Sequence, residues 1–200
     1  YEALAPYVLI TITAPQPRVY AASAPDLIAD EDARSTLLTA LGFLSGTESA
    51  YETADGLAVT EGGDRLLLTS AGAVTFRAGD ESRYPIARER DLPLVYDFVL
   101  TGARQTDTGW EVTFHVMLEG VPVLMSGDGW SARFLVENGR ISEFSFVLRT
   151  YTATETVTTL PTYRLSAAAL RSLPSRGGQL VLCYSDNRGA MVTAGWMTGE

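Results

Sequence analysis

The sequence contains no lysine, and this absence limits the partners that the chain can have. All 15 basic residues are arginine, against 24 acidic residues, which gives a formal net charge of −9 over 200 residues. The arginines are scattered along the chain, and only Arg88 and Arg90 stand close together. Because clustered basic side chains bind phosphate backbones, nucleic acid is not an expected partner. An anionic membrane surface would also repel a chain of this charge.

Cysteine and histidine are scarce, which argues against several kinds of catalytic and metal site. Cys183 is the only cysteine, so no intramolecular disulfide can form, and its apolar neighbours predict a small buried residue. His115 is the only histidine and no nucleophile motif accompanies it, so we interpret it as a partly exposed strand residue. A zinc site would need mostly carboxylates. We expect no enzyme activity, no catalytic residues, no metal and no cofactor.

Long apolar runs are also missing. No run reaches the roughly 20 residues of a membrane-spanning helix, and no signal peptide is recognisable. The chain begins with Tyr1 rather than methionine. We interpret it as an excised portion of a longer protein whose N-terminal membrane anchor was left out.

What is present is the composition of a folded domain, 46% hydrophobic and 20% charged. The first half contains one helical pattern, in which Asp30 is the N-cap, apolar residues from Ala33 to Leu44 share a face, and Gly46 ends the helix. Patterns rich in β-branched residues predict strands at 7–13, 57–60, 65–69 and 73–77. The two middle strands flank Gly62-Gly63, which predicts a hairpin.

The second half follows a polar linker at 78–90 and a short helix from Asp91 to about Thr101. Alternating patterns then predict strands at 110–118, 130–137 and 141–151, with Asn138-Gly139 as a hairpin turn. A short helix at 167–173 and a hairpin of 180–184 with 190–196 complete the chain. Helices followed by antiparallel strands predict an α+β fold, with curved antiparallel sheets and short helices packed on one face. We expect two subdomains, at 1–85 and 86–200.

The segment from Thr150 to Thr162 is polar and contains seven threonines. We favour a solvated connector, while an exposed edge strand that a partner could extend is the alternative. Tyr151 and Tyr163 flank the segment and are candidate protein-interaction residues, expected to be exposed.

One region resembles a known family. Gly120-Val121-Pro122-Val123 precedes an alternating strand from Trp130 to Glu137, the turn Asn138-Gly139-Arg140 and a long strand. Ala169-Leu170 then lies in the short helix, and Tyr184 and Trp196 lie in the final hairpin. These features resemble the YycI family of two-component regulatory proteins over residues 91–197, with Ala194-Gly195-Trp196 standing where a Pro-Ala-Trp ending is usual. The first half resembles the related YycH and PepSY-like domains only in its order of elements.

The resemblance implies two PepSY-like subdomains outside the cell, anchored to the bacterial cell membrane by an N-terminal helix. It implies a non-catalytic regulatory or interaction domain, whose partners are a membrane histidine kinase that controls cell-wall metabolism and a homologous accessory protein. The alternative is a PepSY-like inhibitor or chaperone for a secreted hydrolase. Two further alternatives stay open: an enzyme with an unrecognised carboxylate site, and a binding protein for a small envelope component.

Overall fold

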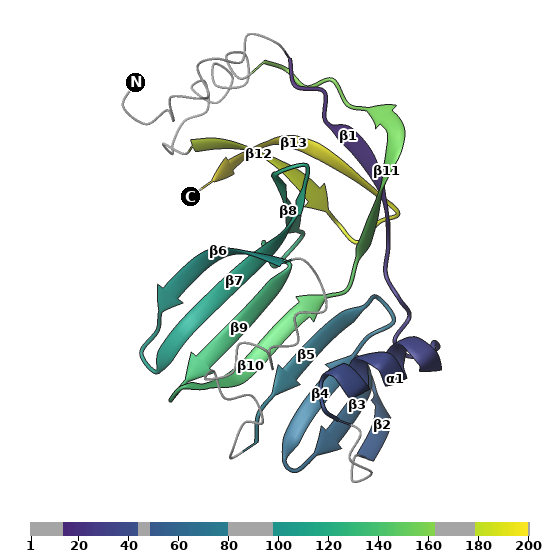
Figure 1. Ribbon diagram of the computed structural model, residues 1–200, viewed down its shortest axis with the longest axis vertical. Helices are drawn as coiled ribbons and strands as arrows, with labels where there is room; N and C mark the ends of the chain where they lie inside the picture. The colour runs from purple at the N-terminus through teal and green to yellow at the C-terminus, as the bar shows by residue number, and fades with distance from the viewer. Residues whose placement is uncertain (1–13, 44–48, 80–97, 163–178, 200) are drawn as a thin grey trace. The chain divides into compact units, whose positions relative to one another are not determined.

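The computed structural model describes residues 14–43, 49–79, 98–162 and 179–199 (Figure 1). Of these residues, 60% lie in strands and 7% in one helix. Hydrogen bonds join the 13 strands of the described ranges in a large mixed sheet. The α+β prediction, with short helices packed on one face of curved sheets, is therefore wrong.

The chain divides into two compact units that interleave along the sequence. Unit 1 contains the described residues up to Ala22, Leu118–Ser126 and those from Tyr151 onward. Unit 2 contains the described residues between Ser23 and Met117 and between Gly127 and Thr150. The subdomain boundary that the sequence predicts at residue 85 lies outside the described residues.

Unit 2 is an eight-stranded antiparallel sheet in the order β6-β7-β9-β10-β5-β4-β3-β2. Its strands are β2 (Ser49–Thr53), β3 (Gly56–Glu61), β4 (Asp64–Leu68), β5 (Ala73–Arg77), β6 (Phe98–Gln105), β7 (Gly109–Leu118), β9 (Ala132–Glu137) and β10 (Arg140–Val147). Leu118, the last residue of β7, belongs to unit 1.

One face of the unit 2 sheet is apolar and forms a hydrophobic core. Phe144 lies at its centre, with ring centroids 4.8 Å from Phe76 and 5.5 Å from Phe146, both stacked. Helix α1 (Glu31–Ala40) packs on this face through Leu37 and Leu38, which are buried (Figure 1). Burying each such side chain stabilises the fold by roughly 1.5–3 kcal/mol.

Helix α1 begins as predicted and ends earlier than predicted. The Asp30 carboxylate accepts a hydrogen bond from the Ala33 N–H at 2.9 Å, which confirms Asp30 as the N-cap. The helix ends at Ala40, and Gly42 follows with a φ of +70°. A glycine takes this left-handed conformation without strain, so it stops the helix before the predicted Gly46, which lies outside the described residues.

Unit 1 contains five strands in the order β11-β1-β13-β12-β8. They are β1 (Arg18–Ser23), β8 (Val121–Met125), β11 (Thr150–Val157), β12 (Gln179–Asp186) and β13 (Met191–Gly199). The terminal residues Ser23 and Thr150 belong to unit 2. Strands β12 and β8 are parallel, whereas β12 with β13 and β1 with β13 are antiparallel. Tyr184 is buried at the centre, its ring perpendicular to that of Tyr20 with centroids 5.3 Å apart.

The predicted hairpins are confirmed and one predicted helix is partly wrong. The turns at Gly62-Gly63 and Asn138-Gly139 have positive φ at both residues, as short hairpin turns require. Residues 98–101, predicted to end a helix, lie in β6 because they pair with β7. The predicted strand at 7–13 and the predicted helix at 167–173 lie outside the described residues.

Candidate interaction site

The threonine-rich segment forms a strand at the end of the unit 1 sheet. β11 lies beside β1, and the N–H groups of Thr158 and Leu160 donate to the carbonyls of Pro17 and Pro15 at 2.9 and 3.0 Å. Across the described ranges, no strand pairs with the other side of β11. The alternative of an exposed edge strand, rather than a solvated connector, therefore describes residues 150–157.

A hydroxyl group replaces one main-chain bond between β11 and β1. The Thr154 hydroxyl donates to the Val19 carbonyl at 2.8 Å and accepts from the Thr156 N–H at 3.2 Å. Because Thr158 directs its N–H toward β1, its neighbour Val157 directs its own N–H to the open side. Val157 is also 49% exposed, so both its main chain and its side chain are available to a partner.

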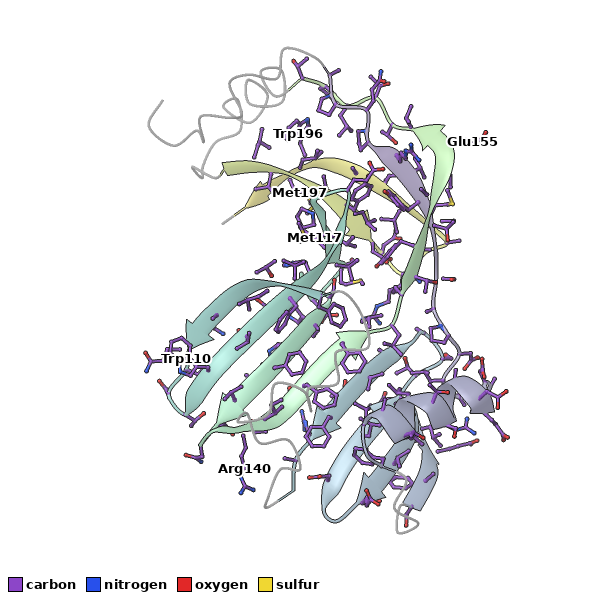
Figure 2. All side chains as sticks on the ribbon, viewed as in Figure 1. Trp110, Met117, Arg140, Glu155, Trp196 and Met197 are labelled. Atoms are coloured by element: carbon purple, nitrogen blue, oxygen red, sulfur yellow. The ribbon has the colours of Figure 1, made fainter. Side chains whose placement is uncertain are left out.

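The open side of β11 lacks the features that usually prevent strands from pairing. β11 contains no proline, glycine or lysine, and its only charged residue is Glu155. Glu155 is exposed, and Figure 2 shows it on the outer side of the strand. Thr152, Ala153 and Thr156 are exposed as well. A strand of this composition is suited to accept an additional strand from another molecule.

Of the two tyrosines predicted as exposed interaction residues, the structure describes only Tyr151. Tyr151 is half-buried, and its hydroxyl donates to the Asp186 carboxylate at 2.8 Å. Asp186 is fully buried and also accepts from the Arg188 N–H at 2.7 Å. Tyr151 thus attaches β11 to the turn between β12 and β13. Tyr163 lies outside the described residues.

The scarce reactive side chains are engaged in structural contacts. The His115 ring contacts the Thr101 hydroxyl through Nδ1 at 2.5 Å and the Gly129 carbonyl through Nε2 at 2.6 Å. Cys183 is buried, as expected, and burial raises the pKa of its thiol. Burial also raises the pKa of Tyr184 to about 12, so its hydroxyl, which donates to the Arg18 carbonyl, stays protonated.

Two carboxylates have lowered pKa values, and both accept hydrogen bonds from neighbouring side chains. The Arg133 guanidinium, followed by that of Arg104, lowers the pKa of Glu111. The Thr108 hydroxyl, followed by that of Ser142, lowers the pKa of Glu137. Lowered values keep both groups ionised at neutral pH, whereas a general acid needs a raised value. Within the described ranges, no group of three or more potential ligands could hold a metal ion.

A depression of about 360 Å³ lies beside the turn between β2 and β3. Glu52, Asp55, Thr53 and Ser70 contribute to its lining together with Ile28. This lining is polar and mostly exposed. It therefore differs from the deep apolar pocket that a binding protein for a small envelope component would have.

Comparison with known proteins shows the fold alone. No family model and no curated protein matches the chain. A crystal structure of an uncharacterized protein from Eubacterium rectale ATCC 33656 is similar, with a TM-score of 0.58 and 9% sequence identity. The similarity covers 92% of this chain and 78% of the other.

Proposed function

We propose that the protein is a non-catalytic interaction domain that binds another protein by adding a strand to β11. The observation that carries the proposal is the open side of β11, which has exposed side chains and a single charge. Strand addition obtains affinity from main-chain hydrogen bonds and specificity from alternate side chains. It needs no cofactor and no catalytic residue.

The resemblance to the YycI family supports an extracytoplasmic location and a regulatory role. On that basis, the partners are a membrane histidine kinase and a homologous accessory protein, and an N-terminal helix anchors the protein to the membrane. No helix in the described ranges is long and apolar enough to cross a membrane.

The test compares two substitutions at Val157 in the full-length, membrane-anchored protein. Val157→Pro removes the N–H on the open side of β11, whereas Val157→Thr keeps it with a side chain of similar shape. Each protein is captured from its own organism with bound partners, which mass spectrometry identifies. We expect the wild-type protein and Val157→Thr to recover a sensor histidine kinase, and Val157→Pro to lose it.

Two results would contradict the proposal. Equal recovery of the kinase by Val157→Pro and Val157→Thr would show that β11 is not the contact. Recovery of a secreted hydrolase without a kinase would favour the inhibitor or chaperone alternative. Denaturant unfolding of both variants provides the control, because a fully unfolded Val157→Pro would lose any partner. In that case Val157→Lys, which keeps the main chain and adds a charge at the edge, replaces it.

A further inference from the structure

The polar face of the unit 2 sheet carries four arginines that are far apart in the sequence. Strand pairing places Arg104 opposite Glu111, Arg77 opposite Glu143, and Arg65 opposite Arg77. The fourth, Arg133 on β9, lies between the two glutamates and contacts both. We call Arg65, Arg77, Arg104 and Arg133 the arginine row. It crosses the strands β6, β9, β5 and β4 on the side opposite the hydrophobic core.

Two glutamates neutralise part of the arginine row. Glu111 contacts Arg104 at 2.9 Å and Arg133 at 2.8 Å, and Glu143 contacts Arg133 and Arg77, both at 3.3 Å. The glutamate side chains are only 18% and 23% exposed, whereas those of Arg77 and Arg104 are both 74% exposed. Guanidinium groups therefore form the outer surface, while the carboxylates lie beneath them.

Arg65 is the member of the arginine row that forms no ion pair with a described residue. Across the part of the chain that the structure describes, no carboxylate lies within ion-pair distance of Arg65, which is exposed. Directly opposite residues on antiparallel strands have Cβ atoms about 5 Å apart, and like charges there are unfavourable. Arg77 provides such a like charge, and its Nε contacts the Glu143 carboxylate at 3.3 Å. An anion between Arg65 and Arg77 would relieve this repulsion.

We propose that the arginine row is a docking surface for an acidic segment of a partner protein, with a partner carboxylate bound between Arg65 and Arg77. Three members of the row already bind glutamate carboxylates, and a guanidinium fork suits a carboxylate geometrically. The net charge of −9 disfavours a long polyanion, which would meet repulsion along its length. A short acidic segment makes local contacts, within the screening length of about 8 Å at physiological salt.

The experiment uses the 200-residue chain and a synthetic peptide of four Glu-Ser repeats, with a Gln-Ser peptide as the uncharged control. Titrations are followed by NMR through the arginine Nε–H signals. We expect saturable shifts of the Arg65 and Arg77 signals with the acidic peptide only. The double variant Arg65→Ser/Arg77→Ser should bind at least about tenfold more weakly, because each charge-assisted hydrogen bond accounts for that order of affinity.

A matched variant controls for the loss of positive charge. Arg140 lies at the tip of the β9–β10 hairpin and points away from the strands (Figure 2). Arg140→Ser should change the affinity less than about twofold, since Arg140 lies outside the row. If the double variant does not fold, Arg65→Ser alone serves, because Arg65 makes no ion pair with any described residue.

Three outcomes would overturn the proposal. They are an absence of saturable shifts at Arg65 and Arg77, equal affinity of the double variant and Arg140→Ser, and tighter binding of an oligonucleotide of equal charge than of the acidic peptide. The last outcome would mean that the arginine row binds phosphate groups rather than carboxylates. The arginine row lies in unit 2 and does not depend on β11, so its failure leaves the proposed strand addition untouched.

Discussion

Replacing Glu111 by glutamine tests whether the cross-strand ion pairs of the arginine row stabilise unit 2. Glu111 contacts two guanidinium groups and is largely covered, so the substitution weakens both contacts at once. The Arg104 pair is exposed and contributes about 0.5 kcal/mol, whereas the better covered Arg133 pair contributes about 1 kcal/mol. We expect Glu111→Gln to lower the free energy of unfolding by about 1–2 kcal/mol at pH 7. For a chain of this length, that corresponds to a Tm lower by about 2–8 °C.

The pH dependence provides the sharper part of the test. The arginines lower the pKa of Glu111 in the folded protein, so its stabilisation is complete above its unfolded pKa of about 4.3. That stabilisation is lost as the pH falls through the lower, folded pKa. The stability difference between the wild-type protein and Glu111→Gln should therefore shrink in acid. High salt should also reduce this stability difference, mainly because it screens the exposed pair of Glu111 with Arg104.

The assay is urea unfolding at pH 7 and at acidic pH, at low and high salt. The matched control is Glu155→Gln on β11, the same chemical change at an exposed glutamate that forms no ion pair with any described residue. We expect this control to change stability by less than about 0.5 kcal/mol. The reasoning is refuted if Glu111→Gln costs no more than Glu155→Gln, or if the difference between Glu111→Gln and wild type persists unchanged in acid.

Three further substitutions test the packing. Phe144→Ala removes the ring at the centre of the unit 2 core and should lower the free energy of unfolding by about 3–5 kcal/mol; a loss under about 1 kcal/mol would contradict that placement. Tyr151→Phe removes the hydroxyl that donates to buried Asp186 and should cost about 1–3 kcal/mol in urea unfolding, whereas no change would mean that the contact is not formed. Gly109→Ala should destabilise unit 2 strongly, since its Cβ would clash with the Val136 carbonyl oxygen, and an unchanged Tm would refute that close approach.

The elements that could be predicted from the sequence are those whose signals are local. The hairpin turns at Gly62-Gly63 and Asn138-Gly139 need positive φ at adjacent residues, and these residue types identify them directly. The N-cap at Asp30 is a similar local signal. The alternation from Trp110 to Leu118 predicted β7, in which Phe114 packs against the hydrophobic core although Trp110 is exposed.

The strands that the sequence did not predict depend on distant partners. The first residues of β6 were predicted to end a helix that begins at Asp91. The signal for that helix is local, whereas the pairing of β6 with β7 is not. β11 was interpreted as a connector because its polar composition suits solvent, and only the contacts with β1 make it a strand. For the same reason Tyr151 was expected to be exposed, although a buried carboxylate 35 residues away holds its hydroxyl.

The arginine row could not be predicted for a related reason. Its members stand at positions 65, 77, 104 and 133, and no pair is close enough in the sequence to suggest a basic surface. The registers of β4 with β5 and of β6 with β7 place them on one side of the sheet. A shift of one residue in either register would move an arginine to the apolar face, so the hydrophobic core itself fixes the row.

The two proposed surfaces use different forces, and salt can therefore distinguish them. Strand addition at β11 depends on main-chain hydrogen bonds, which salt screens little, whereas the arginine row depends on charges that are largely screened at high ionic strength. Binding that survives 500 mM salt and is lost in Val157→Pro would belong to β11. Binding that is lost in salt and in Arg65→Ser, yet retained in Val157→Pro, would belong to the arginine row. A partner that uses both surfaces should lose part of its affinity in Val157→Pro and part in Arg65→Ser. The salt dependence of its affinity should disappear only when Arg65 and Arg77 are both replaced.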